Sequence, residues 1–358
     1  MLDLLGSGVG VRSVALTLLS LLAVLYTLYF ARSFFLPVLL ALLLSLLLVP
    51  AVRWLHHRLW VPPAAGAAIV LAVLVGALGL AAAFVVEPAS KWMQTIPSRI
   101  PDIRYRLEFL QRPLSKVQET SEQVQKLTGG ESDGQVVQVR EETMTGLMLR
   151  QTPALAANLL LMFVLIYFIL ASGDLFLRKV VRMVPTFEDK RRAVEIAREI
   201  QERISTYLRT ITIVNVCVGI AVGLAAAAVG FGNYVFWGVF AFALNFIPYL
   251  GPLVGIVAML LVGLLTFDSA AYALVMPAIY FAINLLEGNF ITPSVIGRIL
   301  TLNPVIVFLS LMFWGWIWGV AGALLAVPIL ATFKIVCDHL PLLRPIGEFV
   351  GGESAPDE

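Results

Sequence analysis

The sequence predicts an all-α polytopic membrane protein with about eight transmembrane helices, two of them interrupted, together with amphipathic helices. Of its 358 residues, 59% are hydrophobic and 13% are charged, whereas soluble domains carry roughly 25% charged residues. The apolar residues form long continuous runs, which is typical of a helical bundle and not of the alternating strands of an outer-membrane barrel. Proline and glycine divide two of these runs, which indicates broken helices.

Eight apolar runs follow one another along the chain when each broken run is counted once, and either broken run has the alternative of a re-entrant hairpin. They cover residues 13–30, 34–52, 64–87, 153–172, 210–231, 234–267 (broken), 270–287 and 304–335 (broken). Arg12 precedes the first run as in a signal peptide. Because no small-x-small cleavage pattern follows, we expect a retained first helix.

Basic residues near the helix ends predict the orientation, because cytoplasmic loops carry an excess of lysine and arginine. The loop after the second run carries Arg53 and Arg58. The loop after the fourth run carries Arg178, Lys179, Arg182, Lys190, Arg191, Arg192, Arg198, Arg203 and Arg209. An even number of crossings places both loops and both termini on one side, which we expect to be the cytoplasm.

The runs and loops divide the chain into five parts. Residues 1–87 hold the first three membrane helices, and residues 88–152 form an external amphipathic helical segment. Residues 153–209 hold the fourth membrane helix and a cytoplasmic amphipathic helix. Residues 210–340 form a transport core with the broken helices, and residues 341–358 a polar C-terminal tail.

The external segment contains apolar residues at alternating steps of four and three, the period of a helix that packs lengthwise on another helix. This seam comprises Ile96, Ile100, Ile103, Leu107, Leu110, Leu114 and Val117. Pro97 and Pro101 suit the first turn of such a helix, and Pro113 is expected to kink it. The seam serves either as a subunit contact or external gate, or as packing against the protein's own membrane domain.

Residues 174–208 form a second amphipathic stretch, which we expect to lie along the cytoplasmic interface with its arginines near anionic headgroups. A solvated charged face is the alternative. The apolar face comprises Ala193, Ile196, Ala197, Ile200, Ile204, Tyr207 and Leu208. Asp174 is interpreted as the N-cap of the helix that follows it.

The run 234–267 contains no charged residue and is broken midway by the stretch Asn245 to Pro252. As one helix it would measure about 50 Å, against a hydrocarbon core of roughly 30 Å. Irregular backbone at membrane depth persists only where protein or a watery cavity satisfies its polar groups. A break beside an asparagine therefore indicates a passage or binding site for something polar.

The second broken run resembles the first. Phe236-Trp237-Gly238-Val239 precedes Pro248 by a helical length, and Trp318-Gly319-Val320 precedes Pro328 similarly. Paired broken segments indicate a transporter binding site. Chance similarity between aromatic-rich membrane segments is the alternative.

Few polar residues lie within the apolar runs: Asn215, Asn245, Asn284 and, at the end of the seventh run, Glu287. A carboxylate in or near hydrocarbon is costly and is seldom incidental. Glu287 is followed by Asn289, Thr292 and Pro293. This cluster is interpreted as a site that coordinates a cation or carries a proton. The alternative is that Glu287 anchors a helix end at the interface. For the asparagines, interhelical hydrogen bonding is the favoured role, and a place in the pathway is the alternative.

Small residues recur at helix-contact spacing in three pairs. The pairs are Gly219 with Gly223, Gly251 with Gly255, and Gly315 with Gly319. Cys217 and Cys337 lie in or beside apolar runs without metal-ligand spacing, so neither a disulfide nor a zinc site is predicted.

Other functional classes lack their motifs. No HExxH, GxSxG, paired aspartate or nucleotide-binding loop occurs, so neither an enzyme nor a cofactor is predicted. A net charge of +2 without a basic, aromatic-interleaved tract makes nucleic acid an unexpected partner.

The C-terminal half carries a distinctive series of motifs. The series is Glu287-Gly288-Asn289-Phe290-Ile291-Thr292-Pro293, Gly297-Arg298, Asn303-Pro304, Gly319-Val320-Ala321-Gly322 and Ala326-Val327-Pro328. With the break at Asn245 to Pro252, its order and spacing resemble the autoinducer-2 exporter family of bacterial membrane proteins. The stretches Phe35-Leu36-Pro37 and Pro50-Ala51-Val52-Arg53 are similar to the opening helices of that family, so the resemblance covers about residues 34 to 340.

The resemblance implies a bacterial inner-membrane transporter with about eight spans that forms homo-oligomers, with pentamers among them. Members of the family are linked to export of autoinducer-2, and others to exchange of sodium or lithium for protons. Gly288 stands where the family commonly has asparagine, and Asn303 stands where histidine often precedes the proline. Without an imidazole, residue 303 is not expected to carry a proton.

We therefore expect a secondary transporter that moves a small polar solute, as in signal export, or that exchanges sodium or lithium for protons. Its partners would be the solute, H⁺ or Na⁺, the lipid bilayer and further copies of the chain. The alternatives are a passive oligomeric pore and a membrane scaffold. The candidate pathway residues are Asn215, Asn245, Pro248, Tyr249, Gly251, Pro252, Asn284, Glu287, Asn289, Thr292, Pro293, Asn303, Pro304, Gly322 and Pro328.

Overall fold

A computed structural model describes residues 8–111, 144–173, 186–292 and 301–352, together with the single residues 179, 182 and 294. Within these residues the regular elements are helices, apart from one β-bridge between Leu302 and Gly351. The chain divides into two compact units. Unit 1 comprises Met1–Val75, Ala154–Ile211 and Ser294–Glu358, and unit 2 comprises Gly76–Pro153 and Thr212–Pro293.

The described helices confirm the all-α polytopic membrane fold. Five are long and apolar enough to cross a membrane: Arg32–Leu59, Pro63–Trp92, Glu188–Val229, Ala270–Ile291 and Pro304–His339. Shorter apolar helices cover Ala15–Phe30, Ala156–Ser172, Tyr234–Leu244 and Leu250–Thr266. Each of the eight predicted runs is thus occupied by helix.

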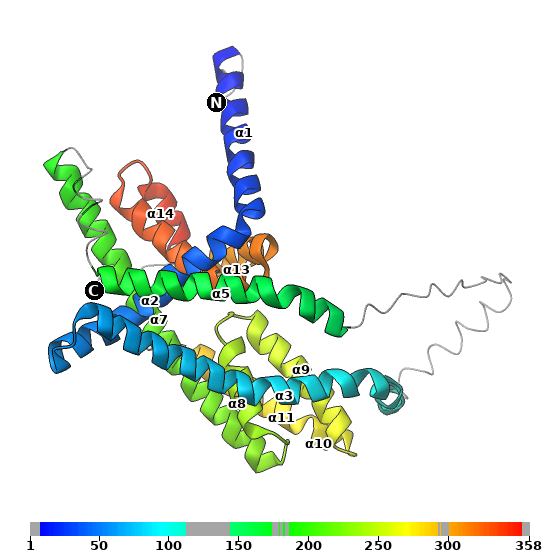
Figure 1. The fold of residues 1–358 in the computed structure, drawn as a ribbon. Coiled ribbons are helices and arrows are strands. Elements are labelled where there is room, and N and C mark those ends of the chain that lie inside the picture. The colour runs from blue at the N-terminus through cyan, green and yellow to red at the C-terminus, as the bar shows by residue number, and fades with distance from the viewer. Residues whose placement is uncertain are drawn as a thin grey trace. The chain divides into compact units, whose positions relative to one another are not determined.

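Unit 1 is built around α2 and α13. Its elements are α1 (Gly8–Phe30), α2 (Arg32–Leu59), the greater part of α5 (Met144–Ser172), the first half of α7 (Phe187–Val229), α13 (Pro304–His339) and α14 (Arg344–Val350), all labelled in Figure 1. Ala41 and Val52 of α2 pack with Ile166 of α5 in one buried cluster. The indole Nε1–H of Trp318 donates to the carbonyl of Leu28 at 3.0 Å, which joins α13 to α1.

The helix α7 joins two segments that the sequence analysis treats as separate elements. It runs unbroken for 43 residues, about 65 Å, because neither proline nor glycine occurs in it before Gly219. Of the predicted amphipathic face, Ile204 is fully buried and Tyr207 is 8% exposed. The Ser205 hydroxyl donates to the Leu46 carbonyl of α2 at 2.7 Å. This part of the face therefore contacts protein.

The helix α3 (Pro63–Gln111) likewise continues beyond its predicted span into the segment that is predicted to be external. It carries the first part of the seam, from Ile96 to Leu110, and Pro97 and Pro101 lie in its interior instead of in a first turn. Leu114, Val117 and Asp174 lie outside the described residues. The contacts predicted for the seam therefore stay a prediction.

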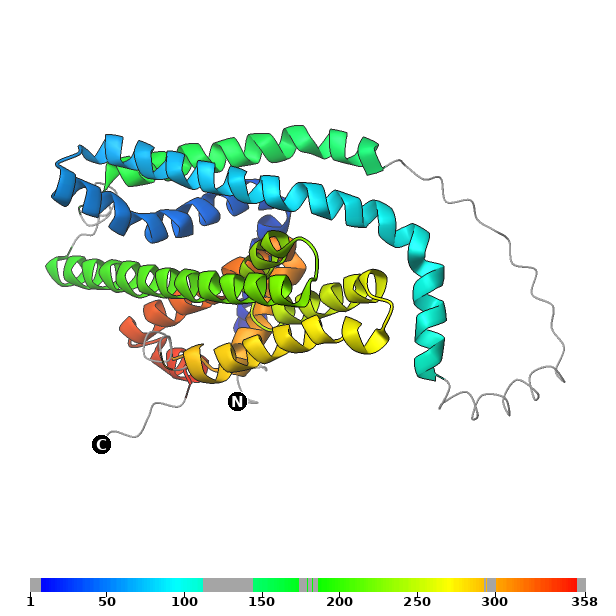
Figure 2. The same ribbon diagram turned by 90° about the horizontal axis from the view of Figure 1, so that it is seen from below.

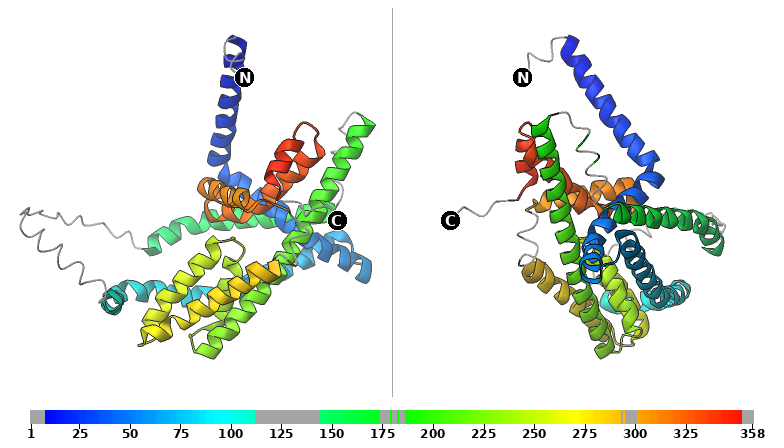
Figure 3. Two further views of the ribbon diagram at one scale, coloured as in Figure 1. Left: turned by 180° about the vertical axis from the view of Figure 1, so that it is seen from behind. Right: turned by 60° about the vertical axis from the view of Figure 1, so that its left-hand side comes forward.

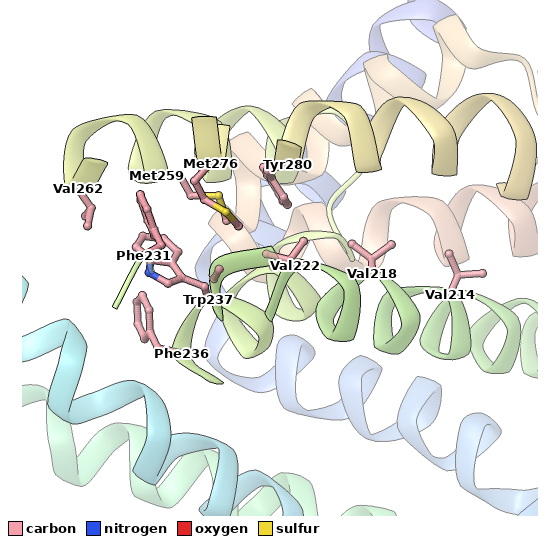
Figure 4. Packing of buried hydrophobic residues seen from close by; sticks show 12 residues of the cluster. Val214, Val218, Val222, Phe231, Phe236, Trp237, Met259, Val262, Met276 and Tyr280 are labelled. Atoms are coloured by element: carbon pink, nitrogen blue, oxygen red, sulfur yellow. The ribbon is translucent and has the colours of Figure 1, made fainter. Parts of the chain in front are cut away.

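Unit 2 packs the second half of α7 against a compact group of helices. This group comprises α8 (Tyr234–Leu244), α9 (Leu250–Thr266), α10 (Ala270–Ala273) and α11 (Val275–Leu286), and Figure 2 shows α9 and α11 alongside each other. Figure 4 shows the core between this group and α7, in which Trp237, Met259 and Tyr280 belong to the same buried cluster as the valines of α7. A Cβ at Gly219 would lie 2.8 Å from the Gly238 carbonyl oxygen, so α7 and α8 cross at glycine.

The break in the run 234–267 is the tip of a helical hairpin, here called the first hairpin, with α8 and α9 as its arms. Residues 245–249 form the tip. A Cβ at Gly251 would collide with the carbonyl group of Leu244, although seven residues of straight helix would separate the two by about 10 Å. The chain therefore folds back on itself, which is the re-entrant alternative.

The second broken run folds in the same way, and α13 is a second hairpin. Its chain reverses at Gly319, whose φ of 65° and ψ of −145° fall in a region that is essentially open only to glycine. The Ser310 hydroxyl donates to the Ala326 carbonyl at 3.2 Å, and a Cβ at Gly322 would collide with the carbonyl group of Trp314. Residues 16 apart would lie about 24 Å apart in a straight helix.

The position of the second break differs from the prediction. The motif comparison placed Pro328 at the second break as Pro248 is placed at the first, but Pro328 lies inside the return arm of the second hairpin, where it is buried. The motif around Trp318 and Gly319 is at a hairpin tip, whereas Trp237 and Gly238 lie inside α8. The proposed alignment of the two motifs is therefore wrong, although both broken runs are hairpins.

The open end of the second hairpin is closed by the C-terminal segment. The Asn303 N–H donates to the Val350 carbonyl at 3.1 Å, and the Gly352 N–H donates to the Thr301 carbonyl at 3.2 Å. Figure 3 shows α14, in red, against the orange α13. Residues up to 352 are therefore part of the hairpin's structure and not a free tail.

Replacing the contact glycines of the hairpins should destabilise the protein. In Gly251→Ala and Gly322→Ala the new methyl group meets a backbone carbonyl that cannot rotate away. Each variant should lose about 1–3 kcal/mol, the usual range for overpacking, measured as a lower apparent melting temperature in detergent. Gly79→Ala is the control, because no atom lies within 4 Å of its added methyl group. Equal melting temperatures for all three variants would contradict the hairpin contacts.

Candidate functional site

The polar residues of unit 2 form the candidate site, and they include a buried asparagine pair. Asn215 of α7 is fully buried, and Asn245, which ends α8, is 8% exposed. The Asn245 Nδ2 donates to the Asn215 Oδ1 at 2.8 Å. This bond fixes the tip of the first hairpin to α7 and confirms the interhelical role predicted for two of the asparagines.

Three buried side-chain atoms in the described part of the chain have no hydrogen-bond partner, and all belong to unit 2. They are Asn215 Nδ2, a donor, Tyr280 Oη, a donor and acceptor, and Asn284 Oδ1, an acceptor. We call them the open polar set. Buried polar atoms in native proteins are nearly always paired, so each unpaired one needs an explanation such as a ligand or water.

Tyr280 connects this set to the first hairpin. It is fully buried on α11, and a Cβ at Gly255 of α9 would lie 2.8 Å from its hydroxyl oxygen. Asn284 follows one turn later and donates its Nδ2 to the Tyr280 carbonyl at 2.8 Å, which leaves its Oδ1 open. Sequence reasoning missed Tyr280, although a tyrosine four residues before Asn284 places two polar groups on one helix face.

Glu287 begins a π-helical turn, Glu287–Ile291, at the end of α11. Such turns are rare and occur frequently at functional sites. The Thr292 hydroxyl donates to the Glu287 carboxylate, so the structure brings these two predicted residues together. Asn289 donates instead to the Leu285 carbonyl at 2.8 Å on its own helix. Pro293 lies outside the described residues.

The tip of the first hairpin is strained. The Leu250 N–H donates to the Pro248 carbonyl at 2.7 Å, and Tyr249 between them has φ 62° and ψ −52°. This is the rare γ-turn with a positive φ, which is costly for a residue with a side chain. The Tyr249 side chain is 57% exposed, while Gly251 and Pro252 lie in the first turn of α9.

The remaining candidate residues belong to unit 1 and shape the second hairpin. Asn303 caps α13 by accepting from the Val305 N–H at 2.9 Å, and Pro304 occupies the first helical position, where proline is favoured. Gly322 permits the close approach of the two arms. These contacts give Asn303, Pro304 and Gly322 structural roles in the hairpin.

Comparison with known proteins identifies the family. Residues 18–342 match the AI-2E family transporter. The chain belongs to this family.

Individual relatives cover most of the chain. It is 28% identical over 323 residues to the AI-2 transport protein TqsA of Escherichia coli, covering 89% of this chain and 90% of TqsA. YhhT of Escherichia coli is 27% identical over 329 residues, covering 90% of this chain and 89% of YhhT. YrrI of Bacillus subtilis is 25% identical over 334 residues, covering 87% of this chain and 88% of YrrI. YhhT and YrrI are named as transport proteins only provisionally.

The resemblance inferred from the motifs is thereby confirmed, and the chain is a multi-pass membrane protein of a transporter family.

The open polar set consists of neutral amide and phenol groups. Such groups hold a ligand by hydrogen bonds and not by charge.

A double-mutant cycle tests the asparagine pair. Asn215→Leu or Asn245→Leu alone leaves the other amide buried without its partner, at a cost of about 1–3 kcal/mol. The double variant should lose less than the sum of the two single losses, because no unpaired half of the bond is left behind. Apparent melting temperatures in detergent measure the cycle, and strictly additive losses would show that the amides are not coupled.

Proposed function

We propose that the chain is a secondary transporter of the bacterial inner membrane that moves a small polar solute through unit 2. The observation that carries the proposal is the open polar set, which offers hydrogen bonds beside a helical hairpin inside an otherwise apolar core. Hairpins and broken helices supply backbone groups and half-helix ends to solutes in many transporters. Because TqsA is named for AI-2 transport, AI-2 is the first solute to test.

We further propose that Glu287 binds the coupling ion, either a proton or Na⁺. Its carboxylate lies at the π-turn that directly follows the helix bearing Tyr280 and Asn284. The end of α11 thus combines a titratable group with two members of the open polar set, Tyr280 and Asn284. The same proposal includes three further points. The solute moves outward, both termini lie in the cytoplasm, and the protein forms a homo-oligomer, for which the motif resemblance implies pentamers.

Two alternatives predict different behaviour. A passive oligomeric pore would conduct without saturation or coupling, which planar-bilayer recording detects. A membrane scaffold would depend on the seam in α3 more than on Glu287. The open polar set favours transport over both, because it offers discrete hydrogen-bond partners to a bound solute.

Neutralising Glu287 should abolish coupled flux without disrupting the protein. Glu287→Gln keeps the size and the acceptor oxygen for Thr292 but removes the charge and the proton-binding site. Proteoliposomes with an imposed pH or sodium gradient should show ion-coupled flux for the wild type and none for the variant. Glu348→Gln is the control, because Glu348 is a largely exposed residue of α14. Unchanged ion-coupled flux in Glu287→Gln would contradict the role of Glu287 in coupling.

Removing the Tyr280 hydroxyl separates transport from stability. Because this hydroxyl is buried and makes no hydrogen bond of normal geometry, although the Asn284 side chain lies close to it, Tyr280→Phe should leave the apparent melting temperature nearly unchanged. Solute uptake should nevertheless fall about two- to tenfold at low concentration, as expected for one lost hydrogen bond of about 0.5–1.5 kcal/mol.

Tyr272→Phe is the matched control within unit 2. The Tyr272 hydroxyl donates to the Val229 carbonyl at 3.0 Å, so its loss should lower stability and leave uptake per folded protein unchanged. Uptake of labelled AI-2 into proteoliposomes and thermal melting measure both variants. If Tyr280→Phe transports like the wild type, the open polar set does not contact the solute.

A further inference from the structure

A cavity of about 540 Å³ opens in unit 2 at the base of the first hairpin, where α8 begins and α9 ends. It is lined by Glu87, Pro88, Lys91, Trp92, Asn233, Leu265 and Thr266. These residues come from the end of the apolar part of α3, from the residue before α8 and from the last turn of α9. The cavity therefore lies where three apolar helices begin or end, which is the level of a membrane–water interface.

The charges at this level support that placement. No charged residue occurs in α3 before Glu87, and none occurs between Tyr234 and Phe267. Glu87 and Lys91 are thus the first charges that α3 carries as it leaves its apolar run. Trp92 follows at once and packs against the buried cluster of unit 2, and tryptophan is enriched at the headgroup level of membranes.

The lining offers one charge of each sign within a single helical turn. The Lys91 Nζ lies 2.7 Å from the Glu87 carboxylate, and both side chains are 72% exposed. An exposed pair of this kind contributes little to stability, about 0–1 kcal/mol. Little stability is therefore lost when a ligand takes the place of one partner in this contact.

The two charges and their neighbours match a particular ligand chemistry. An ammonium group would replace Lys91 at the Glu87 carboxylate, and a phosphate would replace Glu87 at the Lys91 ammonium. Leu265 and the Trp92 ring supply apolar surface beside them, and Asn233 and Thr266 supply polar groups. A ligand with a net negative charge would leave Glu87 opposed instead of paired.

We propose that this cavity binds a phosphate–ammonium zwitterion, the headgroup of phosphatidylethanolamine. The lipid source is favoured over a soluble one because the cavity lies at the level where headgroups are concentrated. The ammonium lies against Glu87, the phosphate against Lys91, and the first methylene groups of the lipid against Leu265 and Trp92. The site is independent of solute transport and does not depend on the proposed function.

Native mass spectrometry of the detergent-solubilised protein tests the site. The protein is incubated with phosphatidylethanolamine or phosphatidylglycerol of identical acyl chains, and the bound lipid is counted. The wild type should retain phosphatidylethanolamine preferentially. Glu87→Gln and Lys91→Gln should each weaken that binding about tenfold, which corresponds to about 1.4 kcal/mol. The charge-exchanged double variant Glu87→Lys with Lys91→Glu should restore it, because both charges are again present.

The matched control is the Arg191–Glu195 pair of α7, which has the same spacing, a 2.8 Å contact and similar exposure but does not line this cavity. Arg191→Gln with Glu195→Gln should leave the lipid preference unchanged. Equal retention of the two lipids by the wild type, or an equal loss in the control, would overturn the site. The soluble headgroup glycerophosphoethanolamine is added as a competitor. If it displaces phosphatidylethanolamine when present at the same concentration as the lipid, the ligand need not be a lipid and that part of the proposal is wrong.

Discussion

The close approach of two helix arms at a glycine is the contact on which the rest of the structure depends. A broken helix in a membrane protein must satisfy its backbone groups within the protein, and both broken runs do so by folding back on themselves. Gly251 lies against the Leu244 carbonyl group and Gly322 against that of Trp314. A methyl group at either position would separate the arms. Through Asn245, the first of these contacts also sets the position of the polar residues at the hairpin tip.

Much of the fold was predictable because its signals lie in the composition of local segments. The apolar runs, the break at Asn245 to Pro252 and the amphipathic face of α7 were visible in this way. The direction of the chain after a break was not, because proline removes a helical hydrogen bond and glycine loosens the helix in a kink and in a hairpin alike. The prediction for Pro328 was wrong because membrane helices tolerate proline. The chain reverses instead at Gly319, through the backbone conformation of that one residue.

The candidate site was predictable where polarity contrasts with the surrounding run. Asn215 and Asn245 stood out as amides among apolar residues, and the structure joins them. Tyr280 did not stand out, because a tyrosine counts as apolar in such a run and its open hydroxyl appears only in the packed core. The two ends of unit 2 also differ in chemistry. The buried set offers neutral hydrogen-bond groups, whereas the cavity beside Glu87 and Lys91 offers opposite charges.

The closure of the second hairpin by residues 350–352 has a consequence for biosynthesis. The N–H group of Asn303 pairs with the Val350 carbonyl, and the Gly352 N–H pairs with the Thr301 carbonyl. While the ribosome is still adding these late residues, the entry arm at Asn303 has no partner at its base. The base of the second hairpin is therefore closed only after residue 352 has been made, whereas the Asn215–Asn245 bond and the Gly251–Leu244 contact of the first hairpin join residues made earlier.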